Sequence, residues 1–250
     1  MKAYKEYLTK LIDILENIRD SQDEKFQQAA EIIANALSSK KMVHFWGPGG
    51  HSSIFAEDVL YREGELALIN PILDPSICLA NGAMKEIEYY ERISEIGKAV
   101  IKANHVAPGD VMVMGSAYGV NPVCIEGALA AKEAGATLIA ITSHFFSDAL
   151  DNEDTRHETG ASLASIADIY ISSFSPFDDL LLEREGFPQK FGPVGTIVQL
   201  SALKALTVSA IELLIERGEE VPIWRNALEK GGAQFNEIYM EQAWRKVKTM

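Results

Sequence analysis

The sequence predicts an α/β protein, a three-layer α-β-α sandwich around a five-stranded parallel sheet. The chain has 250 residues, enough for one large domain or two small ones. Hydrophobic residues make up 47% of it and charged residues 24%, the balance of a globular protein. Five apolar runs of strand length alternate with segments of helical period, which favours right-handed crossovers with helices on both faces: 43–46, 66–69, 111–114, 138–141 and 169–171.

The N-terminal segment, residues 1–32, predicts a helical arm. Apolar residues recur at the spacing of one helical face, at positions 8, 11, 12, 15 and 18, and again after a break at 26, 29, 33 and 37. Ser21, followed three residues later by Glu24, has the pattern of a capping box and predicts the start of the second helix. The apolar stripe has two interpretations, packing against the core and contact with a second copy of the chain.

A single sheet domain is predicted over residues 33–216, and a helical tail over 217–250. Pro122 and Gly135 mark the start and the end of the helix between the third and fourth strands. A longer helix is predicted over residues 194–215, followed by Arg217 and Gly218, a basic last turn and a glycine stop. No boundary between two domains is visible.

The charge of the chain argues against one class of partner. Twenty-three Lys and Arg against thirty-six Asp and Glu give a net charge of −13, which repels a nucleic-acid backbone. A small anion would have to be held by helix N-termini and turn amides. Cys78 and Cys124 form no CxxC pair and no HExxH motif occurs, so we expect no metal.

The start of the chain has no pattern of an export signal, and no window is an uninterrupted apolar run of about 18 residues, the length of a membrane span. We therefore expect a cytoplasmic protein that does not bind a membrane.

The loop after the first strand has the composition of an anion site. Residues 46–53 read Trp-Gly-Pro-Gly-Gly-His-Ser-Ser and precede a helix, so the backbone can approach an anion while hydroxyls add donors. A dinucleotide site would require glycine at Ser52 and an acidic residue at Asn70 or Pro71. A GxxxxGK loop is also missing, and we expect no cofactor.

Two further loops carry hydroxyls. The third strand leads into Ser116-Ala117-Tyr118-Gly119-Val120-Asn121-Pro122, where small residues, hydroxyls and an amide precede a helix that proline opens. Met114 stands where a GxSxG nucleophile elbow would require glycine. The fourth strand ends at Thr142-Ser143. Because ligands bind outside the carboxyl ends of parallel strands, the three loops predict a phosphoryl-binding site at one edge of the sheet.

These stretches resemble the SIS (sugar isomerase) domain, the flavodoxin-like phosphosugar-binding fold of phosphoheptose isomerase. Residues 47–52, 116–121 and 140–143 match its loops, and the resemblance covers roughly residues 33–216. It implies that a phosphate contacts Ser116, Gly119, Asn121 and Ser143. The residues assigned to the sugar and the rest of the pocket are Gly49, Ser52, Lys190 and Tyr118, the last in place of the family's second serine.

More narrowly, the chain is similar to a bacterial subgroup of stand-alone SIS proteins, through Arg156-His157, Lys190 and the tail around Trp224. The resemblance implies a homodimer or homotetramer whose active site is completed across the interface. It also implies that the ligand is a small sugar phosphate.

The activity that the resemblance implies is aldose–ketose isomerisation, which needs a base and an acid at neighbouring carbons. Glu57, His51 and His157 are the candidates for these roles. Phosphoheptose isomerases have a catalytic histidine on the last helix, but no histidine follows His157 in this chain. Two alternatives stay open: a sensor or regulatory subunit that binds sugar phosphates without catalysis, and an etherase-like lyase for a phosphorylated amino sugar.

Overall fold

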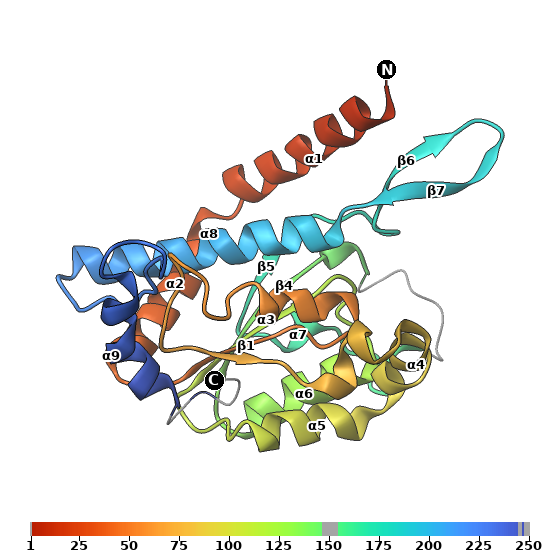
Figure 1. The fold of residues 1–250 in the computed structure, drawn as a ribbon. Coiled ribbons are helices and arrows are strands. Elements are labelled where there is room, and N and C mark those ends of the chain that lie inside the picture. The colour runs from red at the N-terminus through yellow and green to blue at the C-terminus, as the bar shows by residue number, and fades with distance from the viewer. Residues whose placement is uncertain (1, 147–154, 245–246, 248–250) are drawn as a thin grey trace.

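The computed structural model describes residues 2–146, 155–244 and 247, and it confirms the predicted three-layer fold (Figure 1). A five-stranded parallel sheet has the order β2-β1-β3-β4-β5, the flavodoxin-like order. Its strands are β1 (Val43–Trp46), β2 (Asn70–Ile72), β3 (Val111–Ser116), β4 (Thr137–Thr142) and β5 (Ile169–Ser172). An antiparallel hairpin follows, β6 (Leu180–Arg184) and β7 (Phe187–Pro193).

Helices cover both faces of this sheet (Figure 1). In chain order the described helices are α1 (Ala3–Asp20), α2 (Asp23–Ser38), α3 (Ile54–Glu57), α4 (Ala83–Glu88), α5 (Ser94–Ala103), α6 (Pro122–Glu133), α7 (Leu163–Ile166), α8 (Gly195–Glu216) and α9 (Gly232–Trp244). The predicted helices after Pro122 and over 194–215 are therefore confirmed as α6 and α8.

Alternating residues of the central strands divide the core in two. Val43 and Phe45 of β1 pack on the face covered by α2 and α8, whereas Trp46 packs on the face of α5 and α6. Successive side chains of a strand point to opposite faces, so each strand supplies both layers. On the second face α6 approaches closely, because a Cβ on Gly127 would lie 2.3 Å from the Trp46 ring.

The prediction of a second strand at residues 66–69 is wrong. The strand begins at Asn70, which pairs in register with His44 of β1. Residues 66–69 are mostly buried for another reason: the C-terminal tail covers them. An isolated antiparallel bridge joins Leu66 to Ile223, and Ala67 N donates to Pro222 O at 2.7 Å. Burial beneath the tail produces the same apolar pattern as a place in the sheet.

The predicted capping box at Ser21 is also wrong. The hydroxyl of Ser21 donates back to Asn17 O at 2.6 Å, and Gln22 is the residue before α2. The buried Gln22 side chain exchanges two hydrogen bonds with the Ser172 backbone, at 2.9 and 2.7 Å. The start of α2 is thus fixed by a contact to β5, far away in the sequence.

The hairpin β6–β7, which the sequence did not predict, projects beside α1 (Figure 1). Tyr7 Oη donates to Pro193 O at 2.7 Å, and Lys10 Nζ donates to Leu181 O at 2.8 Å. Arg184 adds an ion pair to Glu6 at 2.8 Å. The hairpin and the N-terminal helix therefore support each other at one end of the molecule.

Helix α8 is also long and apolar enough, by length and composition, to cross a membrane. Core helices of globular proteins satisfy the same criterion. Here α8 packs against α2 through buried residues such as Val198, Leu203 and Leu206.

Candidate functional site

A cavity of about 670 Å³ lies at the carboxyl edge of the sheet, between the loops that follow β1 and β3. This is where the strand order reverses, the usual ligand position in open parallel sheets. The start of α8, the segment before β6, Phe55 of α3, and Ile87 and Glu91 from α4 and the turn after it complete the described walls. The predicted residues that line it are Gly49, His51, Ser52, Ser116, Tyr118 and Asn121.

The first loop is built around glycines. A Cβ on Gly47 would lie 1.6 Å from the Ser52 carbonyl oxygen, so no other residue fits there. The loop closes with Ser53 N donating to Gly49 O at 2.8 Å and then enters a short helical turn and α3. Ser52 is half-buried and His51 is exposed at this turn.

The middle loop is a tight turn that opens α6. Gly119, with φ +62°, donates its amide to Ser116 Oγ at 3.0 Å, and a Cβ there would lie 2.7 Å from Thr142 Oγ1. Asn121 caps α6 by accepting from Cys124 N at 2.8 Å. In the described part of the chain, the backbone amides of Ala117 and Asn121 have no hydrogen-bond partner. Such amides at a helix N-terminus are donors for an anion.

The structure places five predicted site residues outside the described lining of this cavity: Gly119, whose amide bonds to Ser116, and Ser143, His157, Glu57 and Lys190. Ser143 is buried and donates to Ser175 O at 2.6 Å. His157 is buried between Glu126 and Thr159, at 3.4 and 2.9 Å. Its backbone amide donates to Val120 O at 3.1 Å, so it supports the middle loop from behind.

The other two are Glu57 and Lys190. Glu57 is exposed on α3 and accepts a hydrogen bond from Ser53 Oγ at 3.4 Å. Lys190 is exposed on β7 and forms an ion pair of 2.7 Å with Asp178, a residue that does line the cavity. Lys190 is therefore one contact away from the site.

Acidic residues that the sequence did not predict as site residues form one wall of the cavity. Glu91, Asp178 and Asp179 line it, and no lysine or arginine is among its described lining residues. Asp179 accepts from Gly195 N at 2.5 Å and from Ser175 Oγ at 2.7 Å. In the sequence, the only indication that these carboxylates line the site was their position in segments that lead to or from the sheet edge.

This wall changes the electrostatics of the site. Burial first, and then the charges of Asp179 and Asp178, raise the pKa of the Tyr118 hydroxyl. Tyr118 therefore stays protonated and able to donate a hydrogen bond. The cavity thus combines hydrogen-bond donors on the middle loop with acidic side chains that come from other segments.

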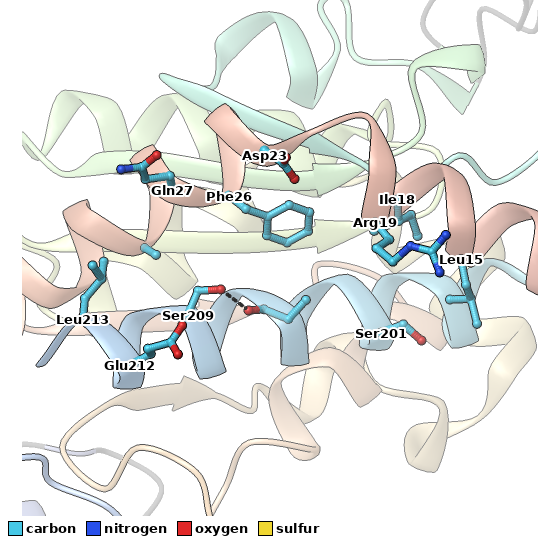
Figure 2. A pocket seen from close by; sticks show the side chains of 12 residues that line it. Leu15, Ile18, Arg19, Asp23, Phe26, Gln27, Ser201, Ser209, Glu212 and Leu213 are labelled. Carbon is cyan, nitrogen blue, oxygen red and sulfur yellow. Dashed lines mark hydrogen bonds between the residues drawn. The ribbon is translucent and has the colours of Figure 1, made fainter. Parts of the chain in front are cut away.

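A second cavity of about 560 Å³ lies far from these loops, between α1, α2 and α8. Figure 2 shows Leu15 of α1 and Phe26 of α2 turned toward α8. The described lining is largely apolar and includes no predicted site residue. Its described lining includes the hydroxyls of Ser201 and Ser209 on α8 but no glycine, and so lacks the glycine turns of the loops.

Comparison with known proteins defines the class. The SIS domain profile matches residues 6–143, more than half of the chain. The chain therefore belongs to the SIS domain family. It is similar along its length to the UPF0309 proteins of Shouchella clausii, at 32% identity over 97% of both chains, and of Brucella canis, at 33% identity over 94% of both.

Two solved structures share the fold. The first comes from Bacteroides fragilis and is described as a putative phosphosugar isomerase involved in capsule formation. It aligns with a TM-score of 0.52 at 16% identity, and the alignment covers 86% of this chain and 91% of that one. Phosphoheptose isomerase from Neisseria gonorrhoeae aligns with a TM-score of 0.50 at 15% identity, covering 84% and 95%. These likenesses show the arrangement of the sheet and helices.

Proposed function

We propose that this protein binds a sugar phosphate in the cavity at the sheet edge and interconverts its aldose and ketose forms. One observation carries the proposal: the loop 116–121 presents the backbone amides of Ala117, directly after β3, and of Asn121, at the start of α6, beside a cavity large enough for a sugar phosphate. The description of two fold neighbours as a phosphosugar isomerase and a phosphoheptose isomerase supports it.

In this proposal the phosphate is held by Ser116, by the turn at Gly119 and by the backbone amide of Asn121. Gly49, Ser52 and Tyr118 line the space left for the sugar. Of the three predicted candidates for the base and the acid, His51 is the one that lines this space. Because no lysine or arginine lines the described cavity, the phosphate must be recognised by short hydrogen bonds.

The binding half of the proposal is tested by thermal shift with sugar phosphates and their unphosphorylated parents. We expect a rise in melting temperature with the phosphorylated sugars alone, because ligand that binds only the folded state stabilises it. Ser116→Ala combined with Asn121→Ala removes the rise. Equal shifts with both sets of sugars would contradict the phosphate cradle.

The catalytic half is tested by solvent deuterium entering the carbon next to the carbonyl, followed by NMR. Exchange is expected for an isomerase. Binding without exchange or product would favour the sensor, and cleavage of an ether-linked amino sugar phosphate would favour the lyase.

We also propose a cytoplasmic homodimer or homotetramer. Helix α1 exposes Leu8 and Ile12, at 49% and 54%, and α8 exposes Val208 and Ile215, at 58% and 62%. Light scattering should show an assembly that Leu8→Asp weakens, because a charge is placed in a buried contact. Leu228→Asp, at a tail position 95% exposed, is the matched control and should leave the mass unchanged.

A further inference from the structure

Two glutamates on the segment after β2 meet at the first loop. We propose that Glu91 carries the proton between the reacting carbons of the sugar, and that Glu86 behind it is a positioning residue that holds this carboxylate and sets its charge. The inference rests on the isomerase function proposed above and deepens it by naming the acid–base group.

Glu91 reaches the cavity between the two loops that carry the site. Its Oε1 accepts from Gly50 N at 2.8 Å, and its Oε2 accepts from Asn121 Nδ2 at 2.9 Å. One donor follows β1 and the other follows β3, so the carboxylate is fixed at the point where the strand order reverses. A Cβ on Gly49 would lie 3.0 Å from Glu91 Oε1, so glycine leaves the carboxylate its room.

Glu86 lies behind this carboxylate on α4 and is only 1% exposed. In the described part of the chain, neither of its carboxyl oxygens has a hydrogen-bond partner of normal geometry. A Cβ on Gly50 would lie 2.4 Å from Glu86 Oε2, so the carboxyl packs directly against the first loop. A buried carboxyl without a donor is costly when ionised and favours keeping its proton.

The two groups act on each other. Burial first, and then the Glu91 charge, raise the pKa of Glu86 to about 8, while the Gly50 amide opposes the rise. At neutral pH Glu86 therefore keeps its proton, behind the Glu91 carboxyl that lines the cavity. A pair of carboxyls whose environments separate their proton affinities is the usual arrangement of a working acid and base.

No described cation neutralises the pair. Lys85 lies over the Tyr90 ring at 4.9 Å, and Arg92 is paired with Glu88 at 2.9 Å. The titratable groups around the pair include Lys85, Glu88, Tyr90 and Arg92 on its own segment, His51 on the first loop, Tyr118 in the cavity lining, the buried Cys124 of α6, and Asp178 and Asp179 across the cavity.

The proton step balances with one carboxylate. Glu91 takes the proton from the carbon next to the carbonyl, and the C–H electron pair becomes the C=C bond of an enediol while the carbonyl oxygen takes a proton from solvent water. Glu91 then returns its proton to the neighbouring carbon, and the hydroxyl proton on the other oxygen returns to water. Glu91 ends in its starting state, and nothing is oxidised or reduced overall.

The experiment measures deuterium exchange into ribulose 5-phosphate, fructose 6-phosphate and sedoheptulose 7-phosphate, together with their thermal shifts. Glu91→Gln keeps the shape of the side chain, and we expect exchange to fall at least about 100-fold, the usual contribution of a general base, while the thermal shift persists. Glu88→Gln, an exposed neighbour paired with Arg92, is the control and should exchange at the wild-type rate.

Glu86→Gln tests positioning through the pH profile. Wild-type exchange should decline above about pH 8, where the Glu86 proton is lost and two adjacent charges disturb the pair. Glu86→Gln cannot ionise, so this decline should disappear. A purely structural role would lower the rate equally at every pH.

The outcomes separate the two proposals. If the wild type exchanges and Glu91→Gln stays within threefold of it, the inference fails while the isomerase function stands. If the wild type binds but exchanges none of the three sugars, the function fails and the inference fails with it. If Glu91→Gln does not fold, Glu91→Asp replaces it. This variant retracts the carboxylate by one methylene, so we expect the deuterium exchange rate to fall at least about 10-fold. Exchange at the wild-type rate would overturn the proposal.

Discussion

The two sides of the cavity differ in how they are built. The donor side, loop 116–121, continues directly from a buried strand into α6 and is fixed by local bonds such as Gly119 N to Ser116 Oγ at 3.0 Å. The acidic side is assembled from segments after β2 and before β6, joined only in the folded state by contacts such as Glu91 to Asn121 at 2.9 Å. A motif in sequence describes the first side, and tertiary structure alone creates the second.

The largest effect should come from breaking the donor side at Gly119. Gly119→Ala places a side chain at φ +62° and 2.7 Å from Thr142 Oγ1, and we expect a loss of about 1–3 kcal/mol in the free energy of unfolding. Chemical denaturation measures it, and the sugar-phosphate thermal shift should vanish as well.

Gly186→Ala is its matched control. Gly186 has φ +77° in the hairpin turn, but its Cβ would meet nothing within 4 Å. The free energy of unfolding of Gly186→Ala should fall by only about 1 kcal/mol, the cost of a left-handed backbone conformation for alanine. Ligand binding should be unchanged. Equal losses at both glycines would show that the contact with Thr142 does not hold the donor side in shape.

Glu86, behind the acidic side, should behave in the opposite way at high pH, because removing its charge there stabilises the fold. The pKa of Glu86 is raised from 4.5 to about 8 in the folded state. Its favourable contribution is therefore present below pH 4.5 and is lost as the pH rises through 8.

Glu86→Gln should match wild-type stability near pH 4.5 and exceed it by about 2 kcal/mol at pH 9, a figure discounted for solvent screening. Melting curves across this range measure the difference. A constant gap between the two proteins would contradict a carboxyl that stays neutral until pH 8.

A smaller effect is expected beneath the donor side, at His44 of β1. Burial lowers the pKa of this imidazole, and Asp110 opposes the change. A histidine with a lowered pKa costs the fold stability as pH falls below the ordinary value, about 6.5. We expect wild type to lose stability through this group between pH 7 and pH 5, a loss that His44→Gln removes.

His105→Asn is the control for that experiment. His105 is exposed and has φ +54°, a conformation that asparagine tolerates. The acid-induced loss should persist in it. If the loss disappeared in His105→Asn, the pH dependence would come from His105 and not from His44.

The smallest effect on stability is expected at the rim, for Lys190→Ala. The side chains of Lys190 and Asp178 are 48% and 32% exposed, and exposed ion pairs contribute about 0.2–1 kcal/mol. Unfolding should change by less than about 0.5 kcal/mol. If Lys190 holds the sugar, the ligand's thermal shift should nevertheless shrink, whereas an unchanged shift would remove Lys190 from the site.

The same contrast explains what the sequence could predict. Strand periodicity located four of the five sheet strands, and the glycine and serine loops after β1 and β3 do line the cavity. The second strand was misplaced because Leu66 and Ala67 are buried by the tail. Ser21 failed as a cap because Gln22 bonds to Ser172, a contact no local pattern encodes.

The sequence could not predict Glu91 of the acidic wall or Glu86 behind it, for a related reason. Glu86 and Glu91 stand in a charged segment that reads as a solvated surface helix, yet Glu86 is 1% exposed. His157 and Ser143 are residue types suited to the site, but their side chains make structural contacts instead. His157 pairs with Glu126 of α6, and Ser143 donates to Ser175 O. Residue type identified candidates, and only packing decided which of them face the cavity.

The most direct test is the electron density of a sugar phosphate bound in a crystal of this protein. We expect phosphate oxygens within hydrogen-bond distance of Ser116 Oγ and the Asn121 backbone amide, with the sugar carbons lying toward Gly50 and Glu91. A phosphate bound elsewhere, such as in the groove between α1, α2 and α8, with the 116–121 loop unoccupied, would contradict it.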